Sequence, residues 1–128
     1  MNQPAIEDLL STTLYSWYSD VSQWVPQSPE STRPCRDCHT GLAAIVDVQA
    51  WPDELVNGLA VAIEGIVRHV AVSFEEDGDD PVAASARARE IVMAGVATRS
   101  SDIRDVLEQC VPYRLQAYRE LDRDLARL

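Results

Sequence analysis

The chain has 128 residues, 46% of them apolar, which is enough for one folded domain with a sizeable core and excludes a disordered chain. Its 21 acidic residues outnumber 11 basic ones, all of which are Arg, so the formal net charge is −10. A field of this sign disfavours direct binding to nucleic acid or to an anionic membrane surface, and it favours a protein partner with a basic surface.

The N-terminal residues and the three cysteines indicate a cytoplasmic protein. The chain does not begin with the basic region that opens a secretory signal, and no apolar run reaches the length of a membrane-spanning helix, about 18 residues. An odd number of cysteines does not suit a disulfide scaffold. In a reducing compartment, a close pair of cysteines more often serves metal or redox chemistry.

The first segment, residues 4–25, predicts an amphipathic helix. Pro4 suits its first turn, and Pro26 stops it. Because Trp17 and Trp24 belong to the apolar stripe, this face either packs in the core or, where it is partly exposed, binds a partner. The stripe recurs at helical spacing and consists of Ile6, Leu9, Leu10, Leu14, Trp17, Val21 and Trp24.

Residues 26–39 predict a connector. Three prolines within residues 26–34 exclude a helix and disfavour a central strand, so we expect an extended segment. The connector leads into a stretch that holds two of the three cysteines and one of the two histidines.

The remaining segment, residues 40–128, predicts the helical core. Thr40 can cap a short helix, and a longer one opens at Asp53. Gly58 and Gly65 lie inside this longer helix, where small residues allow a neighbouring helix to approach closely. The apolar stripe of the longer helix consists of Leu55, Leu59, Ile63, Ile66, Val67, Val70 and Phe74.

Further helices follow an acidic loop. Residues 82–97 predict one helix, residues 100–102 supply the N-cap of the next, and Pro112 breaks or kinks that helix. Beyond Pro112, a last helix carries a stripe with charged residues on its outer face; the stripe consists of Leu115, Tyr118, Leu121, Leu125 and Leu128. With no period-two run of the strand type, the predicted fold is all-α: a single-domain bundle of five to six helices.

The motif Cys35-x-x-Cys38 is half of a zinc site, because two thiolates at this spacing can bind one tetrahedral ion. Two more ligands are needed, and the candidates are His69 and Cys110, with His39 as an alternative ligand. A zinc ion bound in this way would tie the connector to two core helices. Two other interpretations stay open: free thiols, with Cys110 as a small buried apolar residue, or a redox dithiol.

The same stretch also spells Cys-x-x-Cys-His, the attachment signature of c-type haem. Haem of this type is attached outside the cytosol, so an export signal would accompany it. Because the sequence shows no such signal, we do not expect a haem.

Five carboxylates crowd into the six residues of the acidic loop: Glu75, Glu76, Asp77, Asp79 and Asp80. They lack the regular offsets and the terminal bidentate Glu of a calcium loop. The loop is therefore expected to be a solvated turn, and it is also a candidate surface for docking a basic partner.

The sequence contains no Gly-rich phosphate loop, no HExxH and no G-x-S-x-G. Arg87, Arg89, Arg99 and Arg104 form a modest basic stretch that we expect to be ion-paired surface rather than a nucleic-acid site. We therefore expect a non-enzymatic protein-interaction module, an adaptor, regulator or inhibitor, and the Lys-free composition suits a phage or mobile element of a GC-rich host. The alternatives are a structural assembly subunit that forms a homo-oligomer, such as a virion connector or tail component, and a zinc- or dithiol-dependent enzyme.

Overall fold

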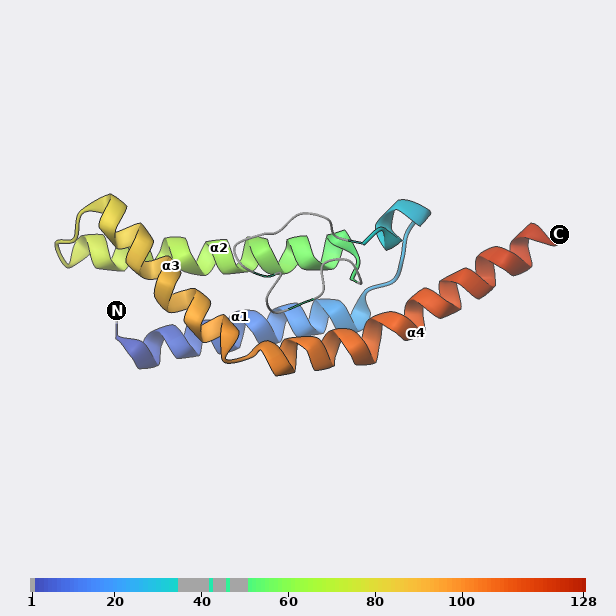
Figure 1. The fold of residues 1–128 in the computed structure, drawn as a ribbon, viewed down its shortest axis with the longest axis horizontal. Coiled ribbons are helices and arrows are strands. Elements are labelled where there is room, and N and C mark those ends of the chain that lie inside the picture. The colour runs from blue at the N-terminus through green and yellow to red at the C-terminus, as the bar shows by residue number, and fades with distance from the viewer. Residues whose placement is uncertain (1, 35–41, 43–45, 47–50) are drawn as a thin grey trace.

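The computed structural model describes residues 2–34, 42, 46 and 51–128, and within them it is all-helical (Figure 1). It contains four α-helices and one short 3₁₀-helix rather than the five to six helices expected. The elements in chain order are α1 (Gln3–Gln23), η1 (Pro29–Thr32), α2 (Asp53–Glu76), α3 (Pro81–Ala97) and α4 (Ser100–Ala126).

Helix α1 forms where the sequence predicts it. The Asn2 side chain accepts a hydrogen bond from the Ala5 N–H at 2.9 Å, which satisfies one of the free donors of the first turn. The helix ends at Gln23, and Trp24 turns the backbone to an extended conformation two residues before Pro26. The predicted stripe is confirmed as a core face, because its members Ile6, Leu10, Leu14, Trp17, Val21 and Trp24 are buried.

The connector is not extended throughout. It contains η1, where Ser28 and Ser31 form a capping box and Pro29 takes the first position, at which its missing N–H costs nothing. An extended backbone resumes at Arg33, whose carbonyl accepts a hydrogen bond from the Asp53 N–H at 2.8 Å. This bond ties the connector to the start of α2.

Helix α2 and helix α3 form an antiparallel pair joined by a tight turn. All seven apolar positions predicted for α2 are buried. Gly78 turns the chain with a φ of 105°, a conformation that side-chain-bearing residues rarely adopt. The Asp80 carboxylate then accepts hydrogen bonds from two backbone N–H groups and starts α3.

The core lies where α1 crosses the other helices: α1 packs against α2, α3 and α4, and α2 packs against α3. Two residues of the predicted short helix after Thr40, Leu42 and Val46, are buried in this core, and the Val46 N–H donates to the Leu42 carbonyl at 2.9 Å. The rest of that predicted helix lies outside the described residues.

Within the described residues, the helix count is lower than expected because α4 continues through Pro112. Proline removes one backbone donor, so the carbonyl of Glu108 loses its helical partner. Glu108 is exposed, and water can therefore reach that carbonyl. The two helices expected on either side of Pro112 are consequently a single helix of 27 residues.

By length and composition alone, α2 is able to cross a membrane: it has 24 residues and a mean hydropathy of 1.5 over its most apolar window. Half of that window is buried against the rest of the protein, which is also the pattern of a core helix. The expectation that the chain has no membrane span therefore stays a prediction.

Candidate interaction surfaces

The predicted metal ligands come from separate parts of the chain. His69 is exposed on α2, and Cys110 is half-buried on α4, where it packs against the core. Cys35, Cys38 and His39 lie outside the described residues. In the part of the chain that is described, no group of three or more His, Cys, Asp or Glu side chains is placed to hold a metal ion. The zinc tetrad stays a prediction, which elemental analysis of the purified protein would test.

Trp17 and Trp24, predicted as core or partner-binding residues, point into the protein. Their exposed fractions are 5% and 8%. The Trp17 Nε1–H donates to the Leu55 carbonyl at 3.2 Å, and the Trp24 Nε1–H donates to Glu54 Oε2 at 3.2 Å. Both indoles therefore join α1 to the first turn of α2, and this structural role agrees with the core interpretation of the stripe.

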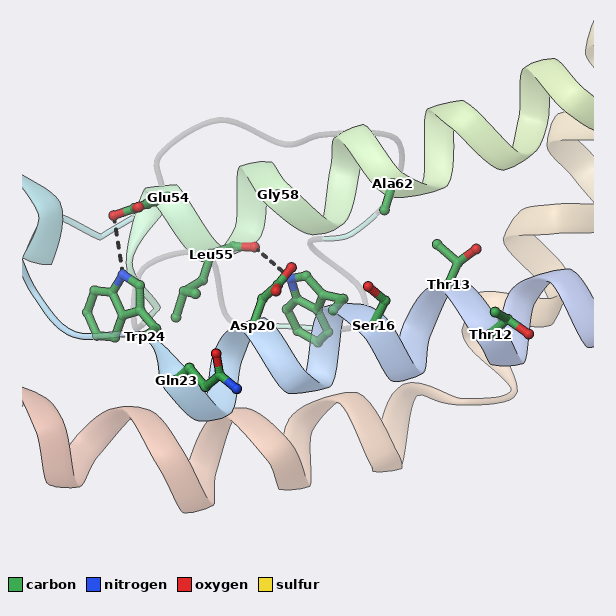
Figure 2. Close-up of a pocket in the computed structure, with 11 residues that line it drawn as sticks. Thr12, Thr13, Ser16, Asp20, Gln23, Trp24, Glu54, Leu55, Gly58 and Ala62 are labelled. Atoms are coloured by element: carbon green, nitrogen blue, oxygen red, sulfur yellow. Dashed lines mark hydrogen bonds between the residues drawn. The ribbon is translucent and has the colours of Figure 1, made fainter.

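These two hydrogen bonds span the floor of an open groove between α1 and α2, which Figure 2 shows. The groove has a volume of about 610 Å³. Its apolar floor is formed by the indoles, and two carboxylates stand on opposite walls, Asp20 from α1 and Glu54 from α2. The polar lining consists of Thr12, Thr13, Ser16, Asp20, Gln23 and Glu54.

The acidic loop is partly a structural element. Asp80 caps α3, and Asp79 forms an ion pair with Arg87 at 3.2 Å. The Arg87 guanidinium also lies 4.3 Å from the centroid of the Phe74 ring, a distance suited to a cation–π contact. Glu75 and Glu76, in the last turn of α2, are exposed, so they are the members of the loop best placed to meet a partner.

The basic stretch is largely ion-paired, as expected. Arg89 holds Glu64 with two parallel hydrogen bonds of 2.5 and 2.8 Å, which join α3 to α2. Arg99 holds Glu7 and so joins the α3–α4 junction to α1. In both pairs the hydrogen bond from the guanidinium lowers the pKa of the carboxyl group below its ordinary value.

The second half of α4 projects beyond the bundle. We call residues 112–128 the α4 arm; it extends past the end of α1, away from the other helices (Figure 1). In the first half of α4, Ile103, Leu107 and Val111 are fully buried. In the arm, Leu121 and Leu125 are each 57% exposed, and Leu128 is fully exposed.

The predicted stripe of the last helix is thus covered only at the base of the arm. Leu115 and Tyr118 are half-buried near the base of the arm, while the three leucines beyond them are exposed. The reason is geometric: α1 ends at Gln23, and no helix in the described part of the chain buries the three leucines beyond Tyr118. We call the five apolar residues of the arm the arm stripe; they are Leu115, Tyr118, Leu121, Leu125 and Leu128.

The base of the arm is fixed to the bundle. The Arg114 guanidinium donates to the Val21 carbonyl at 2.6 Å and to the Ser22 carbonyl, both in the last turn of α1. The Val21 carbonyl also accepts a hydrogen bond from the Trp24 N–H at 3.2 Å. Both carbonyls lie at the negative end of the α1 dipole, so a cation is stabilising there. The sequence predicts the arm stripe but not its exposure, because the exposure of these residues depends on where α1 ends.

The bundle and the arm also differ in charge. Residues 1–111 hold 18 acidic and 7 basic residues, whereas the arm holds three acidic residues and four Arg. An apolar helix face, an acidic bundle and a groove with two carboxylates can each bind another protein. Comparison with protein-family models, with curated proteins and with solved structures finds no match to this chain.

Proposed function

We propose that the chain is a small non-enzymatic protein-interaction module, an adaptor, regulator or inhibitor, and that its contact surface is the α4 arm. The observation that carries the proposal is the exposure of Leu121, Leu125 and Leu128 along one helix face. Single exposed apolar residues are ordinary, but a stripe with the helical period on an unpacked helix is the pattern of a face that binds a partner.

The arm also gains little stability by itself. An isolated helix of about 15 residues is marginal in water, and most helical stability in proteins comes from packing of the apolar face. The bundle nucleates the arm, but beyond Tyr118 the apolar residues of the arm are left largely exposed. A partner on the arm stripe would supply that missing contact.

The charge of the bundle supports a partner with a basic surface. The excess of acidic residues lies in residues 1–111, and Glu75, Glu76, Asp20 and Glu54 are exposed there. Such a field speeds encounters with basic proteins and weakens as salt is added. A partner with a basic surface would thus meet the acidic bundle, while the arm supplies the apolar contact surface.

Site-specific photo-crosslinking tests the proposal. A photoreactive amino acid is placed at Leu121 in one protein and at Val61, which is 64% exposed on α2, in a matched control. We expect a single dominant adduct in a cell extract from position 121 and none from position 61. Adding Leu125→Asp to the first protein should abolish the adduct, and excess unlabelled chain should compete with it.

The result that overturns the proposal is equally specific. If the labelled proteins fold, as circular dichroism shows, and position 121 gives no competable adduct with any protein, including this chain, then the arm stripe is not a binding surface. An adduct that forms equally from both positions would also overturn it, because the contact would not depend on the stripe.

A further inference from the structure

We propose that the arm stripe pairs with the arm stripe of a second copy of this chain, so that two arms lie antiparallel and form a two-fold symmetric dimer. This inference rests on the proposed use of the α4 arm as a contact surface and names the occupant of the arm stripe; the acidic bundle is the surface proposed for a basic partner. The arguments come from the placement of the apolar residues, from the charges beside them and from the charge of the two bundles.

The arm stripe suits pairing with itself. It runs from Leu115 to Leu128, about 20 Å at 1.5 Å per residue, and Leu121 lies near its middle. In an isologous contact, both copies use the same surface. If residue i of one copy touches residue j of the other, then residue j of the first copy also touches residue i of the second. With the axis beside Leu121, that residue meets its own counterpart, and Leu115 of each copy lies level with residue 127 of the other, between Leu125 and Leu128.

The charges beside the stripe are complementary under the same symmetry. Arg119 and Asp122 are three residues apart, so they lie on the same flank of the arm stripe. An antiparallel pair with its axis between positions 119 and 122 sets each Arg119 beside the Asp122 of the other copy. Within the described part of the chain, neither residue has an ion pair in the single copy, so both are available for this contact.

The overall charge selects the antiparallel direction. A parallel pair of arms would bring the two bundles side by side, and residues 1–111 of each copy carry 18 acidic against 7 basic residues. An antiparallel pair places the bundles at opposite ends, where screening at physiological salt, over about 8 Å, removes most of their repulsion. The arm itself, with four Arg and three acidic residues, pairs with its copy without a large charge of one sign.

The contact is small. Specific interfaces usually bury about 1,200–2,000 Å² in total, and two helices that touch over about 20 Å offer no more than the lower end of that range, so we expect weak, micromolar dissociation. Sedimentation analysis of the purified full chain from about 1 to about 100 µM should therefore show a shift from one chain mass to two. Leu121→Asp should reduce the association at least tenfold, whereas Val61→Asp, which adds the same charge at an exposed residue of α2, should leave it unchanged.

A mixing experiment tests the antiparallel pairing itself. Arg119→Asp alone and Asp122→Arg alone each place like charges together at both ends of the reciprocal contact, so each variant should dimerise more weakly than the parent chain. An equimolar mixture of the two should recover association, because every contact in the mixed dimer then joins an acid to an Arg. All variants change exposed positions, and circular dichroism verifies that each one folds.

Four outcomes would overturn the dimer. The first is a single-chain mass at every concentration, and the second is a dimer that Leu121→Asp does not weaken. The third is a ring or filament, and the fourth is two charge variants that fail to recover association when mixed. If the chain stays a monomer while position 121 crosslinks to a different protein, the dimer fails and the proposed function stands; if neither occurs, both fail.

Discussion

The two halves of α4 follow one sequence pattern in two different environments. Up to Val111, apolar residues four apart are fully buried against α1; from Leu121 onward, apolar residues of the same helical period are exposed. The difference arises in another helix, because α1 ends at Gln23 while α4 continues. An apolar stripe therefore indicates that a helix face packs against another element. The length of the neighbouring helix decides whether that element belongs to the same chain.

The largest expected effect separates the two halves directly. Leu107→Ala removes a fully buried side chain from the packed half, and we expect the free energy of unfolding to fall by about 2–5 kcal/mol. Leu121→Ala, in the arm, should change it by less than about 0.5 kcal/mol at concentrations where the chain is a monomer. Urea unfolding of both variants measures the contrast. Equal losses would show that the arm packs as tightly as the bundle.

A second pair of variants tests how closely the bundle is packed where α3 meets α1. A Cβ added at Gly95 would lie 2.4 Å from Leu10 Cδ1, and Leu10 is fully buried, so its side chain has little room to move. Overpacking costs about 1–3 kcal/mol of stability, whereas replacing Gly by Ala in a helix contributes up to about 1 kcal/mol through helix propensity. The cost is the larger of the two, so Gly95→Ala should be destabilising.

Gly65→Ala is the matched control for that variant. An added Cβ at Gly65 meets no atom within 4 Å, so this substitution should stabilise the protein by up to about 1 kcal/mol. Thermal unfolding of the two variants should therefore move in opposite directions. If Gly95→Ala raises the melting temperature as well, α3 and α1 are not in close contact at this point.

The smallest expected effect concerns charge in the bundle, where ion pairs are formed, unlike in the arm. The pKa of Glu64 is lowered by its hydrogen bonds from Arg89, so this group contributes stability above its unfolded-state pKa, and the contribution is lost as the pH falls through the folded-state pKa. Glu64→Gln should cost about 0.5 kcal/mol at pH 7, since the pair is partly exposed.

That cost should vanish in acid. Below the lowered pKa of Glu64 the parent chain has also lost the charged form of the pair, so the unfolding curves of parent and variant should converge as the pH falls through that lowered pKa. Glu90→Gln, on an exposed position of the same helix as Arg89, is the control and should show no such convergence. If the difference in free energy of unfolding between the parent and Glu64→Gln grew toward low pH, the lowered pKa of Glu64 would be contradicted.

Much of the fold could be predicted from the sequence, because the helical period is a local property. The buried faces of α1 and α2 match the predicted stripes, and Pro81 with Asp80 starts α3 within one residue of the expected position. The helix count was wrong, since a proline's cost depends on whether water can satisfy the carbonyl it leaves free. At Glu108, that carbonyl is on the exposed side.

The close approach of helices could not be predicted from glycine positions. The sequence drew attention to Gly58 and Gly65, yet a Cβ at Gly58 would meet only Trp17 Nε1 at 3.9 Å, and one at Gly65 would meet nothing. The tight contact is at Gly95 instead. The glycine that lies where two helices approach closely is determined by the angle between those helices. A local sequence pattern does not determine that angle.

Arg114 gives the arm a defined direction. Its planar, permanently charged guanidinium is held by two carbonyls of α1, so the joint does not loosen as the pH changes across the physiological range. The tip of the arm consequently stands at a set spacing from the acidic bundle, about 20 Å measured along the helix from Leu115 to Leu128. A protein gripped at the tip would be positioned, as well as bound: the chain would serve as a spacer of defined length.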